Sequence, residues 1–365
     1  MQRAGWDVVV LAQCIDQVQL ANLSRDRGVT LAVRQGGEWR QRSFGSILAM
    51  CLVGAAQLLR TCPASIFKSA AWAAVLQGLH LRDSGALSDA DVVHAHFGPV
   101  GLYVSIASNV PTIINFHGYD ATSWPARWGW GLYRCFLDGR LLVAHSAFVE
   151  RQLTGAELRQ VCRVTMGVDL AAFSSPRRAN IWGSRVRLLS VGRLGPQKGH
   201  AEAIKMVDLL RRRLPDIEWS LTIVGEGPSR DQLVNLVAEL KLDEVVNGFS
   251  PVSYSDLPSI YAAADILVVA SQTQPDGWRE AFCRVAVEGM ACGMAVVATP
   301  CGGLVDTIGA GGLMAKGESP EDLADAVVQV LTSRTPNEFA GKAVKQAGQF
   351  TIQQMCADYE KVTAI

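Results

Sequence analysis

The sequence predicts an α/β protein built from two doubly wound parallel-sheet domains with a cleft between them. Its 365 residues are too many for one ordinary domain and enough for two that each bury a core. A content of 49% hydrophobic and 19% charged residues is typical of a well-packed globular protein and excludes a disordered or collagen-like chain. Short apolar segments rich in β-branched residues alternate with helical patterns, as expected for parallel strands covered on both faces.

The predicted strands fall into two groups, separated by a polar segment. This segment, Phe173–Ser184, contains Pro and Gly and has the composition of a linker. We therefore expect a first domain at residues 1–175, a second at 176–345, and a C-terminal helix at 346–365 that can pack back on the first domain. The predicted strands are Asp7–Ala12, Val29–Val33, Asp91–Ala95, Thr112–Phe116, Arg140–Ala144, Val186–Ser190, Trp219–Val224, Val245–Phe249, Ile266–Val269 and Ala295–Ala298.

Charge and cysteine content limit the function and the compartment. The formal net charge is 0, so nothing global predicts nucleic-acid binding. Residues 1–180 are net basic and residues 181–365 net acidic. The basic half suits an anionic membrane face or a phosphorylated acceptor, with simple solvation as the alternative. The nine Cys include no C-x-x-C pair and lie in apolar contexts, which indicates thiols in a reducing compartment, the cytoplasm.

The N-terminal region raises the question of membrane contact. Its first residues have no long apolar core and no cleavage site, so no signal peptide is predicted. The segment Ser43–Leu59 is apolar and uncharged, but falls short of the roughly 20 residues that a spanning helix needs. We interpret it as a core helix. A helix lying at the inner face of the plasma membrane is the alternative.

The motif SVGRLGPQKGH, at residues 190–200, follows the first predicted strand of the second domain. Gly192 allows a sharp turn and the close approach of a ligand. Arg193 offers a planar fork, and Lys198 a point charge, for phosphate oxygens. Both precede a helix expected to begin near His200, whose N-terminus also favours an anion. The motif predicts a diphosphate site, and a strand-to-helix turn with two solvated cations is the alternative.

Two further motifs carry candidate side chains. In EAFCRVAVE, a helix is expected from Arg284 to Cys292. Glu280 then lies just before its N-terminus and Glu288 about one turn inside the helix. Helical side chains lean towards the N-terminus, so both carboxylates can accept hydrogen bonds from sugar hydroxyls of one ligand. Two ordinary surface Glu residues are the alternative. In FHGYD, His117 and Asp120 follow a first-domain strand at its carboxyl end, where ligands bind in such sheets. A satisfied core histidine is the alternative for His117.

Some patterns resemble sites but are interpreted otherwise. Asp89-Ala90-Asp91 matches the D-x-D pattern of metal-dependent transferases, yet it precedes its strand and so lies at the wrong end of the sheet. His94 and His96 alternate along a strand without an evident third metal ligand, and are interpreted as core or cleft-wall residues. Trp124, Trp128 and Trp130 can line an acceptor groove, touch a membrane or simply pack. No metal site is predicted.

The motifs together resemble the family 4 retaining glycosyltransferases of GT-B fold, which has two Rossmann-like domains, and particularly their bacterial exopolysaccharide (colanic-acid-type) branch. The resemblance runs from about Asp91 to Val327 in the family's order. It is carried by DVVHAHFGPVG, INFHGYD, MGVDLAAFS, SVGRLGPQKGH, TIVGEGPSRDQL, YAAADILVVAS, REAFCRVAVEGMACGMAVVATPCGG and GGLMAKGESPEDLADAV.

The resemblance implies a role for each matching position. Arg193 and Lys198 would hold the donor diphosphate, Glu288 the ribose and Glu280 the transferred sugar. The Gly225-Glu226-Gly227 loop and the segment Gly248–Pro251, which includes Phe249, would belong to the nucleotide pocket. The amides near Phe282 and Cys283 would cradle the sugar and diphosphate. His117 would contact the sugar near the reacting centre, with Asp120 orienting its loop or the acceptor.

Two departures from the family are visible. The family opens with a strand and a Gly-rich loop, whereas AGWDVVVLAQ resembles its second strand, so the first domain is expected to lack its first strand. Cys283 stands where Gly or Pro is common, and its side chain can narrow the sugar pocket.

We therefore expect a hexosyltransferase that moves a sugar from a UDP- or GDP-linked donor to a cell-surface glycan or lipid-linked acceptor, with no metal or other cofactor. Peripheral membrane contact is compatible with this activity, and nucleic acid is not expected as a partner. A degenerate GT-B protein that binds nucleotide sugar or a partner without turnover is the main alternative. Another GT-B enzyme, such as an epimerase or a phosphorylase, is a further one.

Overall fold

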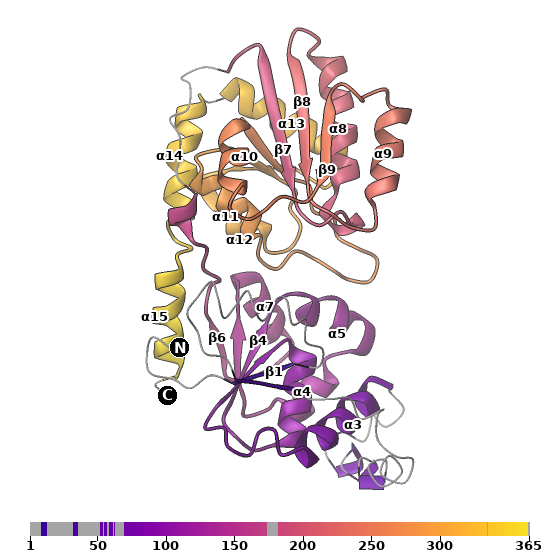
Figure 1. Cartoon of the computed structure of the whole chain (residues 1–365), viewed down its shortest axis with the longest axis vertical. Coiled ribbons are helices and arrows are strands. Elements are labelled where there is room, and N and C mark those ends of the chain that lie inside the picture. The colour runs from indigo at the N-terminus through magenta and orange to yellow at the C-terminus, as the bar shows by residue number, and fades with distance from the viewer. Residues whose placement is uncertain are drawn as a thin grey trace. The chain divides into compact units, whose positions relative to one another are not determined.

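The structure, a computed structural model, describes residues 9–12, 32–35, 52–53, 55–56, 58–60, 62, 69–173, 182–333 and 335–363. The predicted α/β class with two Rossmann-like sheets is confirmed (Figure 1). The described strands form a six-stranded sheet, a four-stranded sheet and a two-stranded parallel pair, β1 (Val9–Ala12) with β2 (Ala32–Gln35).

The six-stranded sheet is buried on both faces because successive side chains of each strand enter different cores. On β10, Ile266 and Val268 join one core while Leu267 and Val269 join the other. Helices α8, α9 and α13 cover the first face, and α10, α11, α12 and α14 the second. The strands are β7 (Arg185–Val191), β8 (Glu218–Val224), β9 (Val246–Ser250), β10 (Ile266–Val269), β11 (Ala295–Ala298) and β12 (Leu313–Met314). The helices are α8 (His200–Arg213), α9 (Arg230–Glu239), α10 (Leu257–Ala263), α11 (Arg284–Ala291), α12 (Leu304–Ile308), α13 (Pro320–Ser333) and α14 (Pro336–Ala347).

The strand order of this sheet is β12-β11-β10-β7-β8-β9. The chain therefore adds strands on one side of β7 up to β9 and on the opposite side from β10 to β12. The chain builds outward from β7 through β8 and β9, then returns to add β10 on the other side of β7. In doubly wound sheets, ligands bind beyond the carboxyl ends of the two strands that flank such a switch point. The loops after β7 and β10 are therefore the expected place for a site.

The four-stranded sheet has the order β3-β4-β5-β6. Its strand β4 is buried along its whole length, which its apolar sequence TIINF predicts. The surrounding elements are α3 (Ser69–Asp83), β3 (Val93–His96), α4 (Gly98–Ala107), β4 (Thr112–Phe116), α5 (Ser123–Trp128), α6 (Gly131–Phe136), β5 (Leu141–Ala144), α7 (Ala147–Gly155) and β6 (Val161–Arg163).

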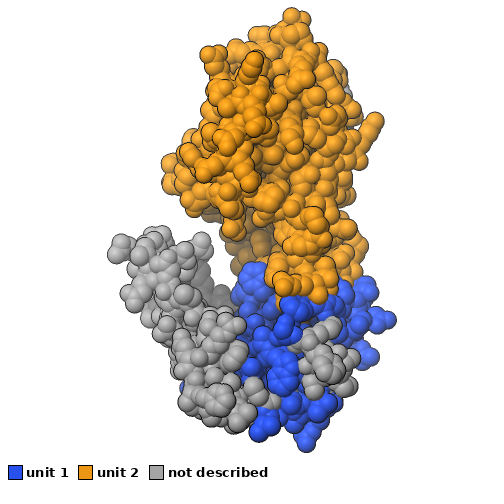
Figure 2. Space-filling model, turned by 90° about the vertical axis from the view of Figure 1, so that its right-hand side faces the viewer, with its two compact units in different colours: residues 1–116, 128–143, 154–161 blue, residues 117–127, 144–153, 162–365 orange. Residues whose placement is uncertain are grey.

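The chain divides into two compact units, coloured separately in Figure 2. Unit 1 comprises Met1–Phe116, Trp128–Val143 and Thr154–Val161. Unit 2 comprises His117–Arg127, Ala144–Leu153 and Cys162–Ile365. Most of the predicted linker, residues 174–181, lies outside the described residues. The domain boundaries at 175 and 345 stay predictions.

The predicted strands agree closely with the observed ones. Thr112–Phe116, Ile266–Val269 and Ala295–Ala298 are reproduced, and the other predicted strands differ from the observed ones by one to three residues at one or both ends, most at Val29–Val33, which is observed as Ala32–Gln35. The sequence analysis missed β6 and β12, whose three and two residues are too short to give a periodic pattern.

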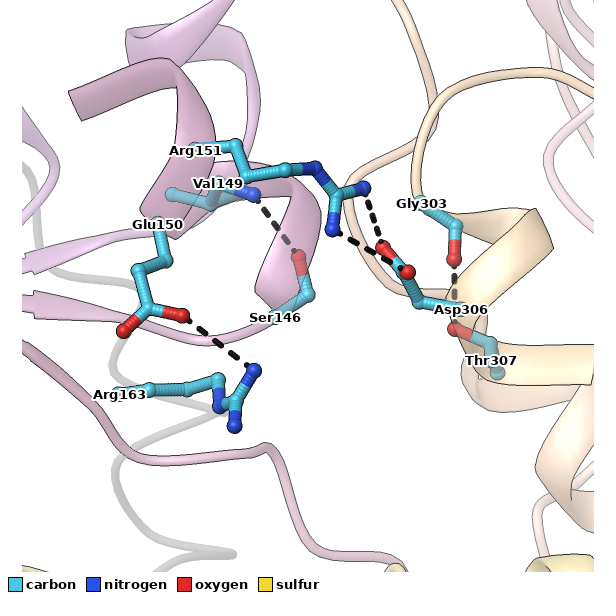
Figure 3. A network of polar contacts seen from close by, with 8 residues as sticks. All are labelled: Ser146, Val149, Glu150, Arg151, Arg163, Gly303, Asp306 and Thr307. Carbon is cyan, nitrogen blue, oxygen red and sulfur yellow. Dashed lines mark hydrogen bonds and ion pairs between the residues drawn. The ribbon is translucent and has the colours of Figure 1, made fainter. Parts of the chain in front are cut away.

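Within unit 2, segment 144–153 contacts both α12 and the C-terminal helix α15 (Ile352–Thr363). Arg151 on α7 forms a two-pronged ion pair with Asp306 on α12, with distances of 2.8 and 3.3 Å (Figure 3). The ring of His145 lies 6.4 Å from that of Tyr359 on α15. Packing of this helix on the first domain stays a prediction.

The apolar segment Ser43–Leu59 falls largely outside the described residues. Its described residues 52–53, 55–56 and 58–59 are helical. Leu58 is buried while Leu52 and Leu59 are exposed, so neither interpretation of this segment is decided. Among the helices that the structure describes, none has the length and hydropathy that crossing a bilayer requires.

Candidate active site

Two glycine-bearing loops meet at the carboxyl ends of β7 and β8. The Gly192 amide donates to Val224 O (2.9 Å), and the Leu194 amide donates to Glu226 O (2.8 Å). A side chain at Gly225 would place its Cβ 1.9 Å from Gly192 O, and Gly225 also has φ +149°. Only glycine fits this close approach without strain. The loop contacts therefore explain the Gly-Glu-Gly sequence at this position.

These loops line a pocket of about 660 Å³. Of the predicted donor-binding residues, Gly192, Arg193, Glu226 and Gly227 lie in its wall. The Arg193 guanidinium is exposed, and no hydrogen bond or ion pair holds it among the described residues. The remaining lining residues are Val191, Val224, Gly225, Pro251, Val252 and Leu257. The pocket wall is therefore mostly apolar and includes one cationic side chain, Arg193, that is not bound by other described residues.

Lys198 and Glu280 come together although 82 positions separate them in the chain. Lys198 Nζ donates to Glu280 Oε2 at 2.6 Å, and Ser271 Oγ donates to the same oxygen at 3.2 Å. The Lys198 ammonium also lies 5.6 Å from the centre of the Trp278 ring. The loops after β7 and β10 therefore meet at the switch point, as the strand order requires.

The charge state of Lys198 follows from two opposing effects. Burial lowers the pKa of Lys198, but the charge of Glu280 and the hydrogen bond to it outweigh burial, so the pKa is raised from 10.5. Lys198 is therefore a cation at physiological pH. An ammonium has further N–H groups beyond the one that Glu280 accepts, and these can donate to a phosphate.

Glu288 is a nearly fully buried carboxylate on α11, at 3% exposure. Tyr261 OH donates to its Oε2 at 2.9 Å, and Arg284, one turn earlier on the same helix, lies 3.6 Å from its Oε1. Burial raises the pKa of Glu288 above 4.5, and Tyr261 and Arg284 only partly oppose this. A buried carboxylate with only these partners retains capacity to accept ligand hydroxyl groups.

Cys283 lies near both carboxylates. Burial and the charge of Glu280 raise the pKa of its thiol to about 12, with Lys198 opposing and Glu288 adding to the effect. Cys283 is the N-cap of α11 and offers that helix no side-chain cap. Neighbouring Phe282 packs edge-on against Phe350, at 5.4 Å between ring centres. The thiol is therefore protonated, and the backbone is the part of this segment suited to bind a ligand.

The His117 loop is fixed by a buried carboxylate in unit 2. Asp120 is fully buried, and its Oδ1 accepts the amides of His117 (3.0 Å) and Gly118 (2.8 Å). A Cβ at Gly118 would lie 2.6 Å from the Cβ of Ala281, the residue after Glu280. The His117 ring stacks at 4.7 Å on that of His145. The structure thus brings the His117 loop to the Glu280 segment.

Phe249 is placed differently from the pocket-lining residues. Its side chain is buried in the core beneath α8 and α9, and its carbonyl oxygen accepts a hydrogen bond from Arg230 (3.2 Å). A donor contact at this position would have to come from the backbone.

The residues of the patterns that we did not interpret as sites are buried or contact neighbouring residues. Asp89 precedes β3 and accepts a hydrogen bond from Ser88 (2.9 Å). Burial lowers the pKa of His94 to about 4, with the charge of His96 adding to this effect. Trp124 is buried, and Trp130 packs on Tyr133. Within the described ranges, no group of three or more His, Cys, Asp or Glu is arranged to hold a metal ion.

Several neighbours of the candidate site escaped the sequence analysis. They are Tyr261, Ser271 and Trp278, which contact Glu288, Glu280 and Lys198. Tyr261 and Ser271 lie inside segments that resemble the family, but no spacing rule marks them as partners of those groups.

Comparisons with known proteins support one family. The family model described as "Glycosyl transferases group 1" matches residues 175–348. The chain is 33% identical over 262 residues to a D-inositol 3-phosphate glycosyltransferase of Pseudarthrobacter chlorophenolicus, covering 65% of this chain and 61% of that protein. It is 30% identical over 294 residues to the protein of that name in Paenarthrobacter aurescens, covering 73% and 71%. The chain thus spans 61% of the length of the first relative.

Solved structures share the whole fold. The crystal structure of Anabaena Alr3699/HepE in complex with UDP has a TM-score of 0.70 at 18% identity, covering 98% of this chain and 92% of that one. The same protein in complex with UDP-glucose gives the same values. At this identity the likeness shows the fold alone, which is the predicted GT-B fold. Fold and sequence relatives agree, and the chain belongs to the glycosyl transferases group 1 family.

Proposed function

We propose that the chain is a retaining, metal-independent transferase that moves a hexose from a nucleoside diphosphate sugar to a cell-surface glycan or lipid-linked acceptor. The observation that carries this proposal is the 2.6 Å contact of Lys198 with Glu280 beside the pocket lined by Gly192 and Arg193. Cations and carboxylates that converge at a switch point suit a ligand with both phosphates and hydroxyl groups.

In the proposed complex the diphosphate lies against the Gly192 turn. Arg193 binds it through its planar fork and Lys198 through the N–H groups that Glu280 does not accept. The uncapped N-terminus of α11 adds its amides and dipole. UDP is the first nucleotide to test, because the Anabaena structures of the same fold contain UDP and UDP-glucose.

The carboxylates address the hydroxyl-bearing parts of the donor. Glu288 accepts from the ribose and Glu280 from the transferred sugar, as the resemblance to family 4 implies. Tyr261 and Arg284 only partly offset the cost of burying the Glu288 carboxylate at 3% exposure, so its remaining lone pairs suit a hydroxyl-bearing ligand. The buried carboxylate is therefore itself an argument for a hydroxyl-bearing ligand.

The proposed reaction breaks the bond between the sugar's anomeric carbon and the phosphate oxygen, and forms a bond from that carbon to the acceptor oxygen. The acceptor's proton passes to the departing diphosphate. Arg193 and Lys198 stabilise the charge that develops on the leaving group. Attack from the same face as departure gives retention. Lys198 and Ser271 both bind Oε2 of Glu280, so Oε1 is the oxygen that can accept the sugar hydroxyl groups.

The acceptor is less defined than the donor. The two relatives named above are D-inositol 3-phosphate glycosyltransferases, so a phosphorylated polyol is a second candidate acceptor. A phosphorylated acceptor also suits the net basic first half of the chain. A panel containing inositol phosphates and lipid-linked phosphosugars distinguishes the two classes.

The test is a transfer assay with UDP- and GDP-hexoses, with the wild type and with Lys198→Ala and Glu288→Ala. We expect the wild type to release nucleoside diphosphate in the presence of an acceptor, and each variant to lose at least about 100-fold in rate. Lys205→Ala is the matched control, because Lys205 is exposed and pairs only loosely with Glu202, at 3.8 Å.

The outcomes separate the proposals. Full activity in both site variants would refute the assigned site, whereas activity with added EDTA supports metal independence. Tight binding of the donor without turnover for any acceptor would favour the non-catalytic alternative. Conversion of the donor in the absence of acceptor would favour an epimerase.

A further inference from the structure

His145 is a buried histidine that the proposed reaction does not use. It follows β5 directly, and its side chain is 4% exposed. Its Nδ1 lies 3.0 Å from Val164 O. A carbonyl oxygen only accepts hydrogen bonds, so Nδ1 carries a proton and donates. The Met166 amide donates in turn to His145 O (3.3 Å), so the ring and the backbone of His145 are both held in place.

The ring of His145 lies against the ring of His117. The two ring centres are 4.7 Å apart and the ring planes are tilted by 31°, while His117 itself is only half-buried. Asp120 accepts the amides of His117 and Gly118, at 3.0 and 2.8 Å, and so fixes the backbone of this loop. These bonds leave the side-chain torsions of His117 undetermined, and the contact with His145 restricts them.

The loop that carries this stack lies beside the candidate active site. A Cβ on Gly118 would lie 2.6 Å from the Cβ of Ala281, which follows Glu280 in the chain. His117, His145 and Glu280 all belong to unit 2. A polar ring next to reacting atoms contributes most when its orientation is fixed beforehand, because a misplacement of about 1 Å can cost about 100-fold in rate.

We propose that His145 is a positioning residue, whose ring stacks against His117 and orients it towards the transferred sugar. The proposal rests on the proposed function, because His117 acts on the sugar of the same donor. It assigns His145 no contact with the ligand. The nucleotide part of the donor should therefore bind equally well with and without this ring, whereas the rate of transfer should fall when the ring is lost.

Two substitutions separate the ring of His145 from its hydrogen bond. His145→Phe keeps a flat ring against His117 but removes the donor to Val164. His145→Asn keeps a donor, since its amide nitrogen takes the place of Nδ1, but removes the ring. With the donor and acceptor that the wild type uses, we expect His145→Phe to keep kcat within about 3-fold and His145→Asn to lose about 10- to 100-fold. In calorimetry, the Kd of UDP should change by less than about 2-fold in both variants.

A purely structural role of His145 predicts the opposite order of activity. His145→Phe leaves the buried Val164 O without its donor, so it would then be the more impaired variant. Phe148→Leu is the matched control, because it removes a buried ring from α7, the helix that follows His145. This control is expected to lower the thermal midpoint and to leave kcat unchanged.

Nuclear magnetic resonance reads the stack without any activity. The chain has six His, so the spectrum of ¹³C-histidine-labelled protein is simple enough to assign by substitution, and His117→Gln identifies the His117 signals. The ring of His145 should shift the ring protons of His117 upfield. This shift should persist in His145→Phe and disappear in His145→Asn.

Each outcome supports or overturns a defined statement. If the wild type transfers sugar from no donor, the proposed function and this inference fail together. If the wild type is active and His145→Asn matches it, only the inference fails. An impaired His145→Phe beside an active His145→Asn would also overturn it, by assigning His145 a structural role through Val164. Loss of both the upfield shift and kcat in His145→Asn, at an unchanged Kd for UDP, is the result that supports it.

Discussion

The ion pair between Lys198 and Glu280 makes a strong prediction about stability. The Lys198 side chain is 26% exposed and that of Glu280 is 9% exposed. In Lys198→Met, Glu280 keeps Ser271 but loses its counter-charge in a nearly closed environment. Breaking a buried pair costs about 3–5 kcal/mol, and the partial exposure of Lys198 lowers this to about 2–3 kcal/mol. For a unit of this size the thermal midpoint should fall by about 5–10 °C.

A double-mutant cycle isolates the pair. Lys198→Met/Glu280→Gln removes the stranded charge, so its unfolding free energy should recover to within about 1 kcal/mol of the wild type. The Glu280→Gln single variant completes the cycle and gives the coupling energy. Because the pKa of Lys198 is raised, its contribution is complete below 10.5 and is lost only as the pH rises through the folded-state value. Thermal unfolding by circular dichroism at pH 7.5 measures the full effect.

The control is Lys205→Met, which removes an exposed lysine of the same unit and should change the unfolding free energy by less than about 0.5 kcal/mol. If Lys198→Met unfolds like the wild type, and the double variant is no more stable than the single one, the ion pair as described is wrong.

Three further predictions concern neighbouring residues. Glu288→Gln should stabilise the unliganded chain at pH 8 while abolishing transfer. Since the pKa of Glu288 is raised, this gain should vanish as the pH falls below about 4.5, and a pH series of unfolding curves measures it. Gly225→Ala should destabilise the chain and abolish UDP binding because its Cβ would collide with Gly192 O, whereas Gly341→Ala, in open space on α14, should stabilise by up to about 1 kcal/mol; calorimetry and thermal unfolding compare the two. Burial lowers the pKa of His200 to about 4, so protonation of this ring in the unfolded chain lowers the unfolding free energy as the pH falls from 6.5 towards 4. His200→Gln removes this titration and should reduce that loss by up to about 3 kcal/mol, as acid unfolding of both proteins measures.

The meeting of Lys198 and Glu280 could be predicted from the sequence because it depends on topology. Each follows an apolar strand that pattern alone identifies, and β7 and β10 are neighbours in the sheet. Loops that follow adjacent parallel strands emerge at the same edge. The sharp turn at Gly192 was expected from the sequence, whereas the close approach of Gly225 to Gly192 O was not, because it depends on how two loops meet.

The contacts around these groups could not be predicted, because they depend on side-chain packing. Tyr261 reaches Glu288 across two helices, α10 and α11, and nothing in the spacing of 27 residues distinguishes it from other aromatic residues. Phe249 was predicted by position within a motif, but its side chain follows the strand's alternation into the core.

The central claim is that Arg193, Lys198, Glu280 and Glu288 bind one nucleoside diphosphate sugar. A crystal structure of the chain with UDP-glucose tests it most directly. The account predicts the diphosphate within hydrogen-bond distance of Arg193 and Lys198, the ribose on Glu288 and the glucose on Glu280. A nucleotide bound away from the Gly192 turn, for example in the polar pocket between α8 and α9 that Lys205 and Gln232 line, would contradict it.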